Sequence, residues 1–220
     1  MNVFKKLFKQ TFIYGLATVL PRALAVFLVP LYVLVLGKEQ FGVYASLMAF
    51  LILGNVLLSY GMETAFFRFI NKEDYKKEKT QSTALTSLTI STLIFLVLTL
   101  SLKTEISIFL NFHVDFIICG LLILALDALV VIPFVWLRTN EKSSRYAFIK
   151  IVNVCINLSF NLFFFLVLPL WAKDTNNSFW DAINLKEGKV AYVFISNLIA
   201  SSITFIMLLP LYFKIKFSFD

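Results

Sequence analysis

The chain has 220 residues, of which 60% are hydrophobic and 25 are phenylalanine. This apolar share lies above the roughly 45–50% that is usual in soluble domains, so the composition excludes a soluble globular protein. The formal net charge of +7 does not require nucleic acid as a partner, because the basic residues flank apolar segments in the manner of a membrane protein.

Six apolar stretches are each long enough to cross the hydrocarbon core, which takes about 20 helical residues. They lie at 11–36, 41–66, 83–102, 116–137, 146–170 and 190–213. We therefore predict an all-α, multi-spanning membrane protein in which residues 1–220 form a single six-helix transmembrane unit. The longest connection, 172–188, has room for a short helix near 179–185.

Lysine and arginine are distributed unequally between the two sides of the predicted spans. One side carries Lys5, Lys6, Lys9, Arg68, Lys72, Lys76, Lys77, Lys79, Arg138, Lys142, Arg145, Lys150, Lys214 and Lys216. The other side carries Lys38, Lys103, Lys173, Lys186 and Lys189. Because cytoplasmic loops are enriched in basic residues, this asymmetry predicts that both termini of the segment are cytoplasmic.

The first predicted span contains an arginine near its centre. Arg22 follows Pro21 and shares one helical face with Thr11, Gly15 and Thr18. It lies about eleven residues, or roughly 16 Å, from the cytoplasmic end. A permanently charged guanidinium is costly at that depth and therefore faces protein or a water-filled cavity.

Asp127 lies at a similar depth in the fourth predicted span. Two interpretations remain open. Arg22 and Asp127 form a structural ion pair that offsets the desolvation of both groups. Alternatively, Arg22 faces a cavity and attracts an anionic group. In that case Asp127 either holds Arg22 ready for this contact or responds to a proton or cation. Glu63 and Arg68, near the cytoplasmic end of the second span, line a cavity mouth or form a solvated pair at the interface.

Polar residues recur at helical spacing within the other spans. Hydroxyl-bearing residues in the third and sixth spans are typical of helix packing in membranes. The fifth span differs, because Lys150, Asn153, Asn157 and Asn161 lie on one face. Such a set exceeds what close packing requires and predicts a wet cavity. Prolines inside the first and fourth spans, including Pro21, favour kinks.

No pattern in the chain indicates catalysis. His113 is the single histidine, and Cys119 and Cys155 fall inside predicted spans without metal or redox spacing. No phosphate-binding glycine loop or nucleophile motif is present. We therefore predict a protein that is not an enzyme and that uses no cofactor or metal.

Several segments are similar to the bacterial polysaccharide flippases. These are 11–15 (TFIYG), 30–37 (PLYVLVLG), 41–44 (FGVY) and 60–69 (YGMETAFFRF), with Asp127 to Pro133, Leu137, Arg138 and the asparagines of the fifth span. The chain thus resembles the O-antigen and exopolysaccharide lipid flippases of the multidrug/oligosaccharidyl-lipid/polysaccharide (MOP) exporter superfamily. The resemblance extends over the whole chain.

The resemblance implies two six-helix lobes, of which residues 1–220 supply the amino-terminal one. The second lobe is expected either later in a longer chain, with truncation the favoured reading, or in a dimer partner. The implied activity is flipping of a polyprenyl-diphosphate-linked oligosaccharide across the bacterial cytoplasmic membrane, in lipopolysaccharide or other surface polysaccharide biosynthesis. The implied partners are that lipid-linked substrate, membrane lipids and, as an open possibility, polysaccharide assembly machinery.

Under this reading, Arg22 attracts the diphosphate and Lys150 provides a weaker second contact. Asn153, Asn157 and Asn161 face sugar hydroxyls and water, and Asp127 is a candidate for ion or proton coupling. Two rival functions remain. A multidrug or cation antiporter of the same superfamily would have an acidic cavity. A membrane scaffold that does not transport would have the polar faces of its helices packed against one another, with no accessible cavity.

Overall fold

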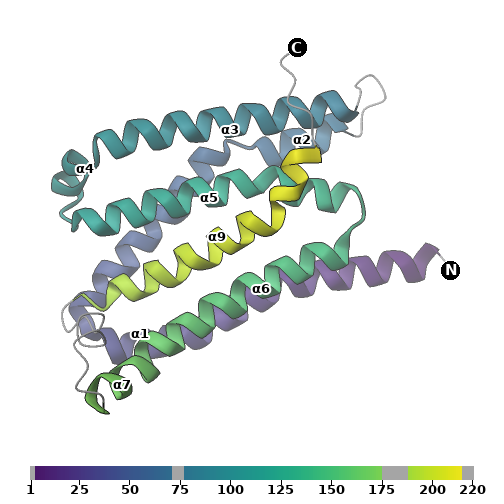
Figure 1. The fold of residues 1–220 in the computed structure, drawn as a ribbon. Helices are drawn as coiled ribbons and strands as arrows, with labels where there is room; N and C mark the ends of the chain where they lie inside the picture. Colours follow the sequence, from purple (N-terminus) through teal and green to yellow (C-terminus); the bar gives the residue numbers. More distant parts are fainter. Residues whose placement is uncertain (1–2, 71–76, 175–187, 215–220) are drawn as a thin grey trace.

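The computed structural model describes residues 3–70, 77–174 and 188–214, excluding the side chains at 3–7, 9, 22, 24, 25 and 172–174. This part of the chain is helical and contains no strand (Figure 1). The elements, in order, are α1 (Val3–Ser59), α2 (Met62–Ile70), α3 (Lys77–Ser101), α4 (Lys103–Leu110), α5 (Val114–Thr139), α6 (Ser143–Leu162), a π-helical turn (Phe163–Val167), α7 (Leu168–Asp174) and α9 (Val190–Lys214).

Five of the described helical segments are long and apolar enough to span a membrane. They are Gln10–Ile70, Lys77–Ser101, Val114–Thr139, Ser143–Trp171 and Val190–Lys214. The first contains 61 residues, far more than one crossing needs, and covers the two predicted spans 11–36 and 41–66. The all-α membrane class predicted from the sequence is therefore confirmed. The helix suggested at 179–185 lies outside the described residues.

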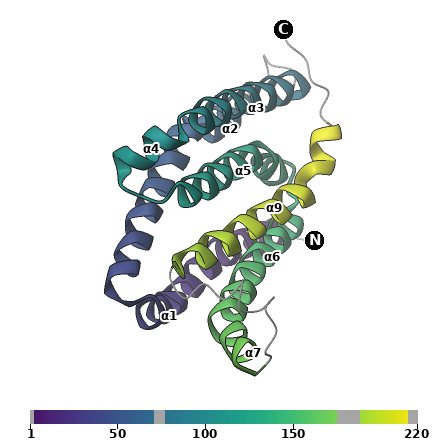
Figure 2. The same cartoon turned by 60° about the vertical axis from the view of Figure 1, so that its left-hand side comes forward.

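A bend at Gly37 divides α1 into two limbs that run in different directions (Figure 2). The backbone of Gly37 has φ of 71° and ψ of 175°, a combination that is essentially restricted to glycine. Helix resumes at once after Gly37, since Lys38 and the next residues are helical. The rings of Tyr32 and Tyr44, one on each limb, meet edge to face with centroids 5.0 Å apart.

The prolines inside α1 do not produce the main bend. Pro21 and Pro30 lie within continuous helix, and Gly37 is the position at which α1 has non-helical dihedral angles. A second irregularity lies in the π-helical turn between α6 and α7, where the N–H of Leu168 donates to the carbonyl of Phe163, five residues earlier. Pro169 follows directly, and it lacks the N–H that a regular helix would require there.

Helix α5 forms the centre of the bundle. Ile132 and Leu137 on this helix have no exposed surface, and it contacts α1, α2, α3, α4, α6 and α9. At Gly54 in α1 an added Cβ would lie 2.9 Å from Leu124, so glycine permits a close approach to α5. Many large side chains on the outer surface are apolar and exposed, among them Leu34 and Val97, as expected for helices that face lipid.

The two ends of the bundle differ in the elements that they contain. The start of α1, the turn between α5 and α6 and the end of α9 lie at one end (Figure 1). The Gly37 bend, α4 and α7 lie at the other end. Arg138 and Lys142 belong to the first end, which is the end predicted from charge to be cytoplasmic.

Candidate functional site

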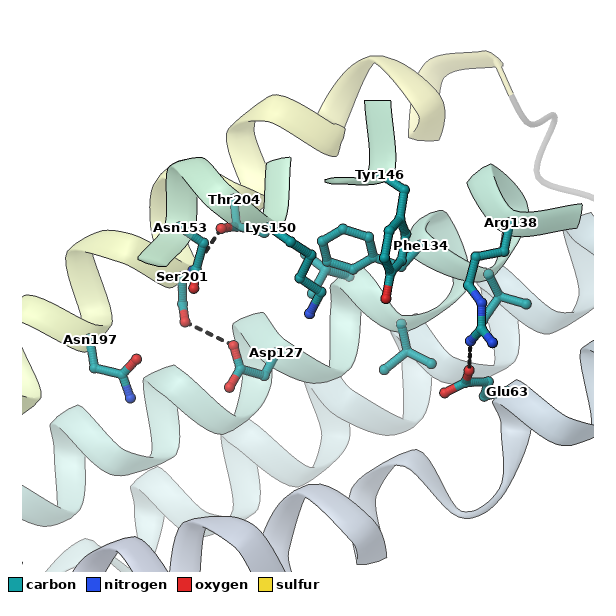
Figure 3. Close-up of a pocket in the computed structure, with 13 residues that line it drawn as sticks. Glu63, Asp127, Phe134, Arg138, Tyr146, Lys150, Asn153, Asn197, Ser201 and Thr204 are labelled. Atoms are coloured by element: carbon teal, nitrogen blue, oxygen red, sulfur yellow. Dashed lines mark hydrogen bonds and ion pairs between the residues drawn. The ribbon is translucent and has the colours of Figure 1, made fainter. Parts of the chain in front are cut away.

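A polar pocket of about 310 Å³ lies among α5, α6 and α9, with α2 at one end (Figure 3). We call it the inner pocket. Its lining comprises Glu63, Asp127, Val130, Val131, Phe134, Val135, Arg138, Tyr146, Lys150, Asn153, Asn197, Ser201 and Thr204. The charged residues are two acids and two bases, so the wall carries no formal net charge when all four are ionised.

Asp127 is held at the inner pocket by two neighbouring helices. The hydroxyl of Ser201, on α9, donates to Oδ1 of Asp127 at 2.8 Å. The amide of Asn55, on α1, lies 3.5 Å from Oδ2. These contacts fix the carboxylate between α1, α5 and α9. The side chain of Arg22, its predicted partner, lies outside the described side chains, so that pairing stays a prediction.

Lys150 reaches into the inner pocket from α6 (Figure 3). Its Nζ lies 4.4 Å from the centroid of the Phe134 ring, which is within cation–π distance. Among the residues that the structure describes, the ammonium has no hydrogen bond or ion pair. An ammonium has three N–H donors, so those of Lys150 are available to a ligand in the pocket.

An ion pair between the exposed side chains of Glu63 and Arg138 lies at one end of the inner pocket (Figure 3). The Arg138 guanidinium also lies 5.0 Å from the centroid of Phe67, on α2. Arg68, the residue predicted to share this mouth with Glu63, is exposed and does not line the pocket. Sequence reasoning assigned Arg138 to the basic cytoplasmic side and so overlooked its contact with Glu63.

The three asparagines of α6 lie in different surroundings. Asn153 lines the inner pocket and donates to Oγ1 of Thr204 at 2.9 Å. Asn157 donates to Oδ1 of Asn197 at 3.3 Å. Asn161 has no exposed surface and accepts a hydrogen bond of 2.9 Å from the Tyr32 hydroxyl. The predicted set is therefore split, and Asn161 connects α6 to α1 in this conformation.

A second pocket of about 150 Å³ adjoins the first on the side of the Gly37 bend. We call it the outer pocket. It is lined by Leu28, Val29, Tyr32, Tyr44, Met48, Asn157, Val193 and Asn197. Sequence reasoning did not include the tyrosines or Asn197 among the site residues. Asn197, Ser201 and Thr204 recur at helical spacing in the sixth predicted span, which could have indicated their shared face, but the hydroxyl-bearing residues of that span were attributed to helix packing.

The described residues contain no group of three or more His, Cys, Asp and Glu side chains that could hold a metal ion. The pockets therefore offer hydrogen bonds and single charges to a ligand. Such groups bind and orient a polar molecule.

Comparison with known proteins identifies a family for this chain. No curated protein and no solved structure matches it. A family model described as "Polysaccharide biosynthesis protein" matches residues 7–220, which is nearly the whole chain. Members of this family are generally transporters and not enzymes. The match agrees with the spans and the polar interior, and the chain belongs to the polysaccharide biosynthesis protein family of MOP-type exporters.

Proposed function

We propose that this protein flips a polyprenyl-diphosphate-linked oligosaccharide from the cytoplasmic to the outer leaflet of the bacterial cytoplasmic membrane. The observation that carries the proposal is the Lys150 ammonium, which faces a polar pocket inside a membrane-spanning bundle of a polysaccharide biosynthesis family. Intramembrane charges are expensive and commonly mark the path of a substrate or ion.

Lys150 supplies a positive charge for the diphosphate or for an acidic sugar. Its position against Phe134 keeps the ammonium within the bundle without neutralising it. Arg22, from α1, is the second proposed contact for the diphosphate, because a guanidinium binds phosphate oxygens in a bidentate manner. Together they are proposed to provide two cations for an anionic headgroup.

Asn153 and Asn157 provide amide groups for sugar hydroxyls. Asn153 uses its amide nitrogen on Thr204, which leaves its carbonyl oxygen as an acceptor toward the inner pocket. Asp127 accepts from Ser201 and retains acceptor capacity for a proton or cation, so it is proposed as the coupling residue. Asn161 is buried and is proposed to act by fixing Asn157.

The arrangement of the whole transporter follows from the same proposal. Residues 1–220 form one lobe, a second six-helix lobe completes the substrate cavity, and the basic end of the bundle faces the cytoplasm. The pocket favours transport over a scaffold role, because a scaffold needs no polar cavity. The two bases balance the two acids of the pocket wall, which differs from the acidic cavity expected of an exporter of cationic drugs.

A complementation experiment tests the proposal. The full-length protein with Lys150→Gln, Lys150→Arg or Arg22→Ala is expressed in a strain that lacks the gene, and surface polysaccharide is measured relative to protein level. We expect Lys150→Gln and Arg22→Ala to reduce polysaccharide at least tenfold and Lys150→Arg to retain most of it. Lys142→Gln is the matched control, since Lys142 lies outside the pocket. Full polysaccharide with both Lys150→Gln and Arg22→Ala would overturn the assigned contacts.

A further inference from the structure

The inner and outer pockets meet at Asn197, on α9. Asn197 lines both pockets, and Asn157, on α6, lines the outer one. The amide nitrogen of Asn157 donates to Oδ1 of Asn197 at 3.3 Å. A contact between two neutral amides therefore connects α6 and α9 at the place where the pockets adjoin.

The α6 side of this contact is fixed by a series of hydrogen bonds. Asn161 Nδ2 donates to both Oδ1 and the backbone oxygen of Asn157, at 2.9 and 2.8 Å. The Tyr32 hydroxyl in turn donates to Oδ1 of Asn161 at 2.9 Å. Tyr32 and Asn161 are buried, so these bonds are shielded from competing water.

The α9 side of the contact is held less firmly. Within the described part of the chain, the amide nitrogen of Asn197 has no hydrogen bond, and Figure 3 shows this side chain at the edge of the inner pocket. Rotation of the Asn197 side chain would break a single neutral hydrogen bond, which at 3.3 Å is longer than the usual N···O distance. The contact can therefore open at small energetic cost.

Both pockets suit water. A water molecule takes up about 30 Å³ and needs two or more polar partners. The inner pocket, of about 310 Å³, has amide, hydroxyl and charged groups in its wall. The outer pocket, of about 150 Å³, has two tyrosines and two asparagines among apolar residues. The π-helical turn Phe163–Val167 follows Asn161 within two residues. Such turns interrupt the regular hydrogen bonding of a helix and are frequent at functional sites.

From these observations, we infer that the Asn157–Asn197 pair is a gate between two water-filled compartments inside the bundle. When it is closed, Asp127 and Lys150 contact only the inner compartment. When it opens, water and small polar solutes reach them from the outer compartment. This path lies within residues 1–220 and requires no glycan, so it goes beyond the proposed function.

Cysteine labelling in the full-length protein tests the gate. Cys119 and Cys155 are first replaced by serine, and a single cysteine is introduced as Asn153→Cys in the inner pocket or Met48→Cys in the outer pocket. A charged, membrane-impermeant methanethiosulfonate is added to right-side-out or inside-out vesicles. We expect the two cysteines to be labelled preferentially from opposite faces.

Asn157→Ala should then open the path. We expect the cysteine at position 153 to be labelled about tenfold faster from the face that labels position 48, a change equivalent to about 1.4 kcal/mol, or one neutral hydrogen bond. Asn161 keeps the backbone oxygen of residue 157 as an acceptor, which favours correct folding. Asn197→Ala should have the same effect from the other side of the contact, and Ser159→Ala, an exposed position on α6, should have none.

Three results would overturn the inference. The first is equal labelling of the cysteine at 153 from both faces before the gate is altered. The second is unchanged labelling of that cysteine in folded Asn157→Ala protein. The third is misfolding of Asn157→Ala together with unchanged labelling in Asn197→Ala. Surface polysaccharide measured in the same strains separates this inference from the proposed function, because a wrong substrate assignment would leave the labelling pattern intact.

Discussion

Removal of one buried hydroxyl group tests whether the Tyr32–Asn161 bond holds α1 against α6. Tyr32 is 3% exposed, Asn161 is 0% exposed, and the hydroxyl donates to Oδ1 of Asn161 at 2.9 Å. Tyr32→Phe retains the aromatic ring and its edge-to-face contact with Tyr44, but it leaves a buried carbonyl oxygen without its donor. Such a loss costs about 1–3 kcal/mol in soluble proteins, and interhelical hydrogen bonds in membranes average about 0.6 with a maximum near 1.7 kcal/mol.

Because this is an interhelical bond inside a membrane protein, we expect Tyr32→Phe to lower the free energy of unfolding by about 0.6–1.7 kcal/mol. Steric trapping of the full-length protein in detergent micelles or bicelles measures this value. Tyr44→Phe is the matched control, because Tyr44 lines the same pocket and its hydroxyl has no hydrogen bond among the described residues. An equal loss in the two variants would refute the reasoning, since the effect would then belong to hydroxyl groups in this pocket in general.

Three further substitutions test the backbone and the Asp127 contacts by the same unfolding measurement. Gly37→Ala should cost about 1–3 kcal/mol because its φ of 71° and ψ of 175° suit only glycine. Gly42→Ala, at a helical position in open space, should instead stabilise the protein by about 0.5–1 kcal/mol; equal effects of the two substitutions would argue against the bend. Gly54→Leu should separate α1 from α5 and cost about 1–3 kcal/mol, and unchanged stability would contradict the close approach. Ser201→Ala should cost about 0.6–1.7 kcal/mol through loss of its interhelical bond to Asp127, and unchanged stability would contradict a stabilising role for that bond.

The fold was largely predictable because membrane spans have a strong sequence signal. Length and hydropathy located the helices: five of the six predicted spans fall within the candidate spans of the structure, and 83–102 passes the end of Lys77–Ser101 by one residue. The connection at Gly37 was predicted less accurately, since the first two predicted spans, 11–36 and 41–66, leave residues 37–40 outside the helices. Lysine, glutamate and glutamine are good helix formers, so helix resumes immediately and Gly37 alone carries the change of direction.

The site was predictable only in part, because sequence spacing assigns a residue to a helix face but does not identify its partner. Lys150, Asn153 and Asp127 were selected from helical spacing and depth, and all three line the inner pocket. The partner of Glu63 proved to be Arg138, on another helix, and not the nearby Arg68. Contacts between residues far apart in the chain depend on how the helices pack, which a single sequence does not specify.

Helical periodicity also gives no measure of how deeply each residue in a stripe is buried. Asn153, Asn157 and Asn161 recur every four residues, yet they contact Thr204, Asn197 and Tyr32 respectively. The stripe crosses from the inner pocket to a packed contact with α1, because α6 meets different neighbours along its length. The regular spacing in the sequence therefore did not distinguish Asn153, which lines the inner pocket, from Asn161, which packs against α1.

The central claim is that Lys150 provides a charge for the diphosphate of a lipid-linked oligosaccharide during flipping. The most direct measurement is translocation of a fluorescent polyprenyl-diphosphate oligosaccharide in proteoliposomes that contain the purified full-length protein. We predict protein-dependent translocation that falls at least tenfold with Lys150→Gln and is largely retained with Lys150→Arg. Translocation that is equally fast in Lys150→Gln, or no faster than in protein-free liposomes, would contradict the account.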